Sequence, residues 1–298
     1  MNGADLEQKF IVAARELGIP SLCVLDFWAN YRGRFADAEG RLAFLPNRIA
    51  IMDERARSEM LGEGFADEML VVTGQPAFDA LTARRRAETP EQRSKRRRAL
   101  GVGDDDLLVV FASQALIEIC LLKGLAPDAF GFTEFTVLSQ AVATLEMLSR
   151  EHGRRIVLLV RPHAREPLEK FREIQSNHEE MIISRDGELP DVMLAADMVV
   201  SMNSVALVEA CYLGVVAVSL QPGLVGPDMV PTNRAGLSRP VYDGAGIAPA
   251  IAELLFDAGQ RAAHLERLRD FHPETGATAR VLKVVEEMLA LSPGLAAP

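Results

Sequence analysis

Short apolar segments that alternate with helical segments constrain the fold of this chain more than any other feature. In its second half the apolar segments are LLVVFAS (107–113), RIVLLV (155–160), EMIIS (180–184), DMVVS (197–201) and VVAVSL (215–220). Strands that are apolar on both faces and alternate with helices are typical of a parallel sheet covered by helices on both sides. We therefore predict an α/β fold.

The same alternation occurs in the first part of the chain, over fewer elements. Its apolar segments are SLCVLDF (21–27), RIAIM (48–52) and MLVVTG (69–74), and residues 5–17 before them have apolar positions at helical spacing. Two such blocks predict two Rossmann-like parallel-sheet domains, of which the N-terminal one is small or incomplete.

The predicted domain boundaries follow changes in composition along the chain. Residues 1–82 form the partial N-terminal domain, residues 83–105 a basic linker, and residues 106–274 the C-terminal domain. Residues 275–298 form a C-terminal helix with one apolar face. We expect that face either to cross back to the N-terminal domain or to form a homodimer.

Charge and cysteine content exclude several classes of protein. A formal net charge of −10 argues against a general grip on nucleic acid. No apolar run reaches the roughly 20 residues that cross a bilayer, and the first residues lack the order of a secretory signal. The three cysteines, Cys23, Cys120 and Cys211, are widely spaced, which argues against a disulfide framework or a zinc cluster. We expect a cytoplasmic protein with reduced thiols.

One segment departs from the acidic balance of the chain. RRRAETPEQRSKRRR, from Arg84 to Arg98, carries eight basic and two acidic side chains. Such a segment suits either a solvated surface of helix and linker, or peripheral contact with acidic lipid headgroups at a membrane. Both interpretations stay open from the sequence.

Polar residues at the carboxyl ends of the second-half strands are the candidates for a ligand site, because ligands of open parallel sheets bind at this edge. Ser201, Asn203 and Ser204 lie between an apolar strand and an apolar helix. Such residues are ordinary helix caps, but hydroxyls and free amides at the positive end of a helix also suit a phosphate. Glu209 in the same helix could accept hydrogen bonds from the hydroxyls of a ribose or a sugar.

Two further loops at the same edge add polar groups. Gln114 follows the first strand of this half, and Arg161 and His163 flank a proline at the end of the second. An arginine offers a planar fork to a phosphate, and a histidine beside it could bind a diphosphate or stabilise a leaving group. The alternative is a structural arginine paired with an acidic neighbour. Together the loops favour a diphosphate ligand.

Three stretches resemble the GT-B superfamily of nucleotide-sugar enzymes, which contains glycosyltransferases and non-hydrolysing UDP-N-acetylglucosamine 2-epimerases. They are VVTGQPAFDAL (71–81), VRPHAREPLEKF (160–171) and ADMVVSMNSVALVEACYLGVVAVSLQPG (196–223). The resemblance implies that the helix start after DMVVS binds the diphosphate of a nucleotide-sugar donor. It also implies that an acidic residue at about Glu209 holds the sugar or ribose.

The chain departs from the epimerase pattern in two places. An epimerase has His-x-Glu-Ala-Gly after the strand SLCVL and Gly-Gly in the later helix-start loop, where this chain has Asp26-Phe27-Trp28 and Met202-Asn203. These departures favour transfer of the sugar to a glycan, lipid-linked or other acceptor in surface-polysaccharide biosynthesis. A 2-epimerase or hydrolase, or a non-catalytic nucleotide-sugar-binding protein, are the alternatives.

Asp26 is the candidate general base, because it ends an apolar strand where a carboxylate could deprotonate an acceptor hydroxyl. The alternative is that Asp26 caps the following turn. We expect Trp28 or Tyr31 to pack against a sugar face and Arg32 to contact substrate. His163 is the second candidate catalytic residue.

No cofactor or metal is expected beyond the donor sugar. No Gly-x-Gly-x-x-Gly sequence follows a strand, and no group of residues has the spacing of metal ligands. Asp53, Asp79 and Glu134 are predicted to be helix caps or solvated carboxylates.

Overall fold

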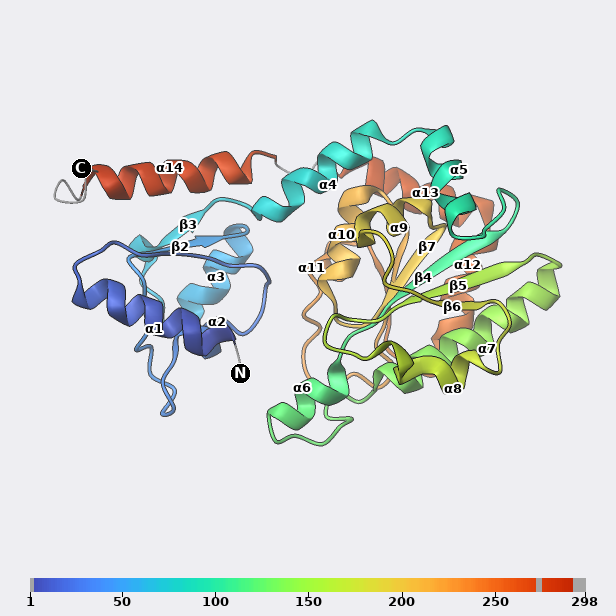
Figure 1. The fold of residues 1–298 in the computed structure, drawn as a ribbon, viewed down its shortest axis with the longest axis horizontal. Helices are drawn as coiled ribbons and strands as arrows, with labels where there is room; N and C mark the ends of the chain where they lie inside the picture. The colour runs from blue at the N-terminus through green and yellow to red at the C-terminus, as the bar shows by residue number, and fades with distance from the viewer. Residues whose placement is uncertain (1–2, 272–274, 292–298) are drawn as a thin grey trace. The chain divides into compact units, whose positions relative to one another are not determined.

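The computed structural model describes residues 3–271 and 275–291, which divide into two compact units. The first unit comprises residues 1–80 and 274–298, and the second comprises residues 81–273. Each unit contains a parallel sheet with helices, so the predicted α/β class is confirmed (Figure 1).

The second unit has a six-stranded sheet in the order β6-β5-β4-β7-β8-β9, and every neighbouring pair is parallel. The strands are β4 (Leu107–Ala112), β5 (Ile156–Arg161), β6 (Met181–Ile183), β7 (Met198–Ser201), β8 (Ala217–Leu220) and β9 (Arg239–Val241). The sequence predicted the first five, and β9 was missed because it has three residues and contains a proline. The order places β4 and β8 on either side of β7, so β5 is separated from β7 by β4.

Helices cover both faces of this sheet. The helices of this unit are α4 (Pro76–Ala87), of which the first residues belong to the other unit, α5 (Pro90–Ala99), α6 (Leu116–Leu122), α7 (Glu134–His152), η2 (Leu168–Phe171), α8 (Arg172–Gln175), α9 (Leu189–Ala195), α10 (Val205–Leu213), α11 (Pro231–Arg234), η3 (Gly244–Gly246), α12 (Ile247–Phe256) and α13 (Ala258–Asp270). The division between the two units falls within α4.

The core explains why the strands are apolar on both faces. Alternate strand residues such as Val109, Phe111 and Leu158 pack with α7 and α12 in one buried cluster. Their neighbours Leu108 and Val110 are also fully buried. They face the other side of the sheet, where α9 and α10 contact β4, β7 and β8 (Figure 1).

The first unit has three parallel strands in the order β1-β2-β3. Its elements are α1 (Gly3–Glu16), β1 (Leu22–Val24), α2 (Tyr31–Phe35), β2 (Arg48–Ile51), α3 (Glu54–Gly62), η1 (Asp67–Met69), β3 (Leu70–Val72), the first residues of α4, and α14 (Ala277–Ala290). The carboxylate of Asp79 accepts from the backbone N–H groups of Gly276 at 2.8 Å and Thr278 at 2.9 Å, which stabilises the N-terminus of α14.

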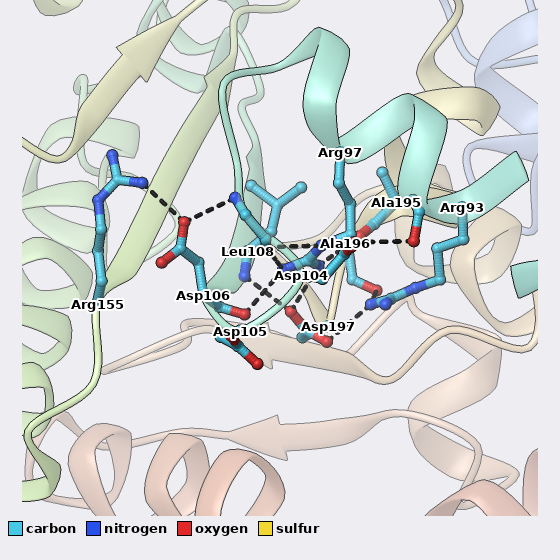
Figure 2. A network of polar contacts seen from close by, with 12 residues as sticks. Arg93, Arg97, Asp104, Asp105, Asp106, Leu108, Arg155, Ala195, Ala196 and Asp197 are labelled. Carbon is cyan, nitrogen blue, oxygen red and sulfur yellow. Dashed lines mark hydrogen bonds and ion pairs between the residues drawn. The ribbon is translucent and has the colours of Figure 1, made fainter. Parts of the chain in front are cut away.

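Residues 83–105 differ from the expected linker. Thr89 caps α5 with a reciprocal capping box, and the helix packs into the second unit. The Arg97 side chain, 1% exposed, donates from NH1 to Ala195 O at 2.9 Å and to Asp197 Oδ2 at 3.0 Å (Figure 2). The sequence left a solvated surface and a contact with lipid headgroups both open, and in the structure several of these guanidiniums form ion pairs within the unit. In the described part of the chain, no helix is long and apolar enough to cross a membrane.

Candidate functional site

The N-terminus of α10 lies at the carboxyl end of β7. Ser204 is the N-cap, and its Oγ accepts from the N–H of Ala206 at 3.2 Å. The N–H groups of Ser204 and Val205 have no hydrogen-bond partner in residues 3–271 and 275–291. The cap is therefore real, and it leaves two amide donors unused at the positive end of a nine-residue helix.

Gln114 joins the loop after β4 to the loop after β7. Its Oε1 accepts from the N–H of Asn203 at 2.8 Å, and its Nε2 donates to the carbonyl oxygen of Asn203. The side-chain Oδ1 of Asn203 is buried and has no partner among the described residues. The structure thus brings Gln114, Asn203 and Ser204 together, with one acceptor left unsatisfied.

Glu209 lies one helical turn beyond Val205, on the same face of α10. Val205 is exposed and Glu209 is half-buried, whereas most other residues of the helix are buried. No described residue forms a hydrogen bond or ion pair with the Glu209 carboxylate, and burial raises its pKa to about 7. A half-buried carboxylate without a partner suits a ligand that brings hydroxyl donors.

His163 is an exposed residue in the loop after β5. Its Nδ1 accepts from the N–H of Arg165 at 3.2 Å, which places the proton of the neutral ring on Nε2. Burial of the ring lowers the pKa of His163 below its usual value. At neutral pH the residue therefore offers a neutral Nε2–H donor.

Glu166, which the sequence did not single out, joins the ends of β4 and β5. Its buried carboxylate accepts from Ser113 Oγ at 3.2 Å and from the backbone N–H of His163 at 2.7 Å. It also pairs with Lys170 Nζ at 2.8 Å. Because Ser113 is distant in sequence from Glu166 and these residues lie in loops and a short helix, no periodic pattern marks them.

Lys170 lies at the centre of three carboxylates, those of Glu118, Glu134 and Glu166. The three are close enough to hold a metal ion, but the ammonium group bonds to each of them. Burial opposes the charge on Lys170, yet these hydrogen bonds outweigh it and raise its pKa. Glu134 was predicted to be a cap or a solvated carboxylate. It is not solvated, because it is fully buried and burial raises its pKa, but its carboxylate accepts from the N–H of Ile117 at 3.3 Å in the first turn of α6.

Ser201 and Arg161 do not reach the site as predicted. The Ser201 side chain is fully buried and donates to the carbonyl oxygen of Ala112 at 2.6 Å, because it ends β7 on an inward-facing position. The guanidinium of Arg161 donates to the carbonyls of Asp186 at 2.7 Å and Gly187 at 2.6 Å, in the loop after β6. Arg161 therefore binds backbone on the β6 side of β5, opposite to the side on which β4 and β7 lie.

Two of the three predicted residues of the first unit have structural roles. Trp28, 5% exposed, donates from Nε1 to Asp53 Oδ2 at 2.8 Å and stacks on Phe78, so it is a core residue and no sugar platform. Arg32 donates to the carbonyl oxygens of Gly40 and Glu63 and so ties two loops together. The sequence could not show this, because a tryptophan or an arginine beside a strand end has the same sequence context whether it is structural or binds a ligand.

Asp26 is the exposed residue of the three. Its carboxylate is 71% exposed and forms an ion pair with Arg34 at 2.6 Å. Asp53, predicted as a cap, accepts from the N–H of Ala56 at the start of α3. Asp79 caps α14 as described above.

A six-stranded parallel sheet with a helix N-terminus at its carboxyl edge, together with a second parallel α/β unit, defines the class of fold. It is the GT-B fold, as the resemblance predicted. No family model and no curated protein matches the chain.

Solved structures with this fold include the following three. The UDP-GlcNAc 2-epimerase of Neisseria meningitidis bound to UDP-GlcNAc has a TM-score of 0.64 and 16% identity, over 94% of this chain and 72% of that one. Alr3699/HepE of Anabaena in complex with UDP-glucose has a TM-score of 0.59 and 13% identity, over 98% and 77%. The wall teichoic acid polymerase TagF has a TM-score of 0.50 and 15% identity, over 83% and 57%. At these identities the likeness establishes the fold alone.

Proposed function

We propose that this protein is a GT-B-like glycosyltransferase that transfers a sugar from a nucleotide-diphosphate sugar to a glycan, lipid or other acceptor in surface-polysaccharide biosynthesis. One observation carries the proposal. The unpartnered carboxylate of Glu209 lies one turn from the two unused amide donors of Ser204 and Val205. Diphosphate and hydroxyl groups on one ligand would satisfy both features.

In this arrangement the diphosphate binds at the start of α10. The N–H groups of Ser204 and Val205 donate to phosphate oxygens without any reorganisation, because Gln114 already fixes the preceding residue, Asn203. The neutral Nε2–H of His163 supplies a further donor for the leaving diphosphate. A neutral donor binds a diphosphate less tightly than a positive charge does, so it favours release of the nucleoside diphosphate product.

Glu209 binds hydroxyls of the ribose or the sugar. When ionised, its two oxygens accept from a vicinal diol. A half-buried carboxylate that accepts no hydrogen bond from the protein is poorly solvated, which costs free energy. The ligand's hydroxyl groups supply hydrogen bonds, so part of the ligand's affinity comes from removing this cost. Asp26 is the proposed general base, because its exposed carboxylate is open to an acceptor hydroxyl.

A sugar-nucleotide 2-epimerase or hydrolase is the second candidate. It is favoured by the similarity to the UDP-GlcNAc 2-epimerase of Neisseria meningitidis over 94% of this chain. The glycosyltransferase ranks first because Asp26-Phe27-Trp28 replaces the acid-base stretch expected of an epimerase, and Trp28 is committed to the core.

A panel of nucleotide sugars tests both candidates. The protein is incubated with each sugar without acceptor, and both thermal stabilisation and products are followed. Stabilisation without product until an acceptor is added supports transfer, whereas an epimerised sugar or free nucleoside diphosphate without acceptor supports the second candidate. If no nucleoside diphosphate or nucleotide sugar stabilises the protein, both are wrong.

A further inference from the structure

A cavity of about 380 Å³ lies in the second unit at the opposite edge of the six-stranded sheet from α10's N-terminus. Its lining includes Ala196 and Asp197, just before β7, and Gly214 to Val216, just before β8. These residues lie at the amino ends of strands whose carboxyl ends carry the candidate nucleotide-sugar site. Three arginines, Arg85, Arg93 and Arg261, also line the cavity.

Arg85, from the end of α4, is held at this cavity by packing and by one hydrogen bond. It donates from NH2 to the carbonyl oxygen of Leu268 at 2.6 Å, and no described carboxylate pairs with it. Gly214 ends α10 with φ 75°, and a Cβ there would lie 2.8 Å from Arg85 Nε. Glycine is therefore required both by the left-handed backbone and by the close approach of the guanidinium.

Arg261, from α13, reaches the same cavity. It donates from NH1 to Leu254 O at 2.8 Å and from NH2 to Asp197 O at 3.1 Å. Like Arg85, it forms no ion pair with a described carboxylate. Burial lowers the pKa of both guanidiniums, and for Arg261 the nearby charge of Asp197 offsets part of this effect.

The two carboxylates on the cavity wall are already neutralised from elsewhere. Asp197 Oδ1 accepts from Arg93 at 2.8 Å, and its Oδ2 accepts from Arg97 at 3.0 Å (Figure 2). Glu88 pairs with Arg96 at 2.6 Å. Among the residues that the structure describes, the half-buried guanidiniums of Arg85 and Arg261 therefore bond to backbone carbonyl oxygens and form no ion pair with a carboxylate.

We propose that this cavity binds a small phosphate monoester, with Arg85 and Arg261 as its anion-binding residues. These two guanidiniums, which form no ion pair with a described carboxylate, match the double negative charge of such a group, and guanidiniums bind phosphate through several N–H donors at once. The aliphatic wall, which includes Leu194, Leu213 and Leu265, suits a small organic group attached to the phosphate. The site accounts for part of the basic segment 84–98 that the proposed catalytic function does not use.

Inorganic phosphate is the first probe, and calorimetric titration of the full chain at low ionic strength measures its affinity. Arg85→Gln and Arg261→Gln are each expected to weaken phosphate binding about tenfold or more, because each removes a charge-assisted hydrogen bond. Arg86→Gln and Arg269→Gln are the matched controls: each removes the same charge from the same helix at an exposed position, and neither should change the affinity. Arg261→Lys keeps the charge and should restore part of the binding.

The source of the phosphate is tested with vesicles that contain phosphatidic acid, measured by co-sedimentation with the same variants. Binding of either probe that needs both Arg85 and Arg261 supports the site. Absence of phosphate and vesicle binding by the unaltered protein overturns it without recourse to any variant. Binding that survives both substitutions also overturns it. Ser204→Ala, which alters the opposite edge of the sheet, should leave phosphate affinity at this cavity unchanged.

Discussion

Gln114 holds Asn203 through both atoms of its side-chain amide, accepting from the backbone N–H at 2.8 Å and donating to the backbone carbonyl. This pairing fixes the residue that precedes the cap of α10, so the orientation of the two unused amide donors depends on a side chain from a different strand loop. Pre-organisation of this kind lowers the entropy lost when a ligand binds.

Gln114→Ala tests that dependence. We expect the free energy of unfolding to fall by about 1–2 kcal/mol, because two backbone groups of Asn203 lose their partner. Stabilisation by a nucleoside diphosphate should fall further, since the loop that presents the donors becomes mobile. Thermal unfolding with and without the nucleotide measures both effects. Gln140→Ala, at an exposed position of α7, is the control and should change neither.

Glu209→Gln should separate stability from ligand binding. Because the pKa of Glu209 rises from 4.5 to about 7 on folding, the folded state holds the proton more tightly, and stability falls as pH rises from about 4.5 through 7. The amide avoids this cost, so the variant should be more stable than the unaltered protein by about 1–3 kcal/mol at about pH 8, with little difference near pH 4.5. Denaturant unfolding at the two pH values measures the difference.

The same substitution should weaken binding of a nucleotide sugar about tenfold or more, because an amide accepts from a diol with only one oxygen. Glu266→Gln removes an exposed carboxylate from α13 and serves as the control for charge. A Glu209→Gln protein that binds nucleotide sugars as tightly as the original would remove Glu209 from the site.

Lys170→Met should be among the most destabilising single substitutions in the second unit. It leaves the buried carboxylates of Glu134 and Glu166 without their cation, and breaking a buried ion pair in this way costs about 3–5 kcal/mol. Lowering the pH should recover part of the loss, because both carboxyls can then take up protons. Chemical unfolding at neutral and acidic pH checks this expectation. Lys123→Met, at an exposed lysine, should cost almost nothing, and an equal loss in both variants would contradict the role given to the cluster.

The sequence was sufficient to predict the fold class, because the spacing and the proportion of apolar residues decide whether a segment forms a buried parallel strand. LLVVFAS and VVAVSL became β4 and β8 as expected. Strand order was not accessible in this way. The sequence placed the loops after β4, β5 and β7 at one edge of the sheet, and only the structure shows that β4 lies between β5 and β7.

The position of the candidate residues in the fold was predicted in part for a similar reason. Ser204 and Glu209 belong to a helix whose start can be read from its cap, and both lie where expected. Ser201 is the last residue of β7, and its side chain is buried. Only the register of the sheet shows that its hydroxyl donates to the carbonyl oxygen of Ala112. The Glu118, Glu134, Glu166 and Lys170 cluster joins four loops and helices, so it has no local sequence pattern.

Arg161→Ala decides between the sequence-based role of Arg161 and the one seen in the fold. If Arg161 held the diphosphate, the substitution would abolish stabilisation by nucleotides. Its guanidinium instead donates to the carbonyl oxygens of Asp186 and Gly187, so we expect a loss of about 1–3 kcal/mol in the free energy of unfolding. Nucleotide affinity should change less than it does in Glu209→Gln. Parallel titration of a nucleoside diphosphate into the two variants measures the contrast, with Arg172→Ala, an exposed arginine of α8, as the control. A larger loss of nucleotide affinity in Arg161→Ala than in Glu209→Gln would show that Arg161 binds the diphosphate. The loop after β6 would then have to release the Arg161 side chain when the nucleotide binds.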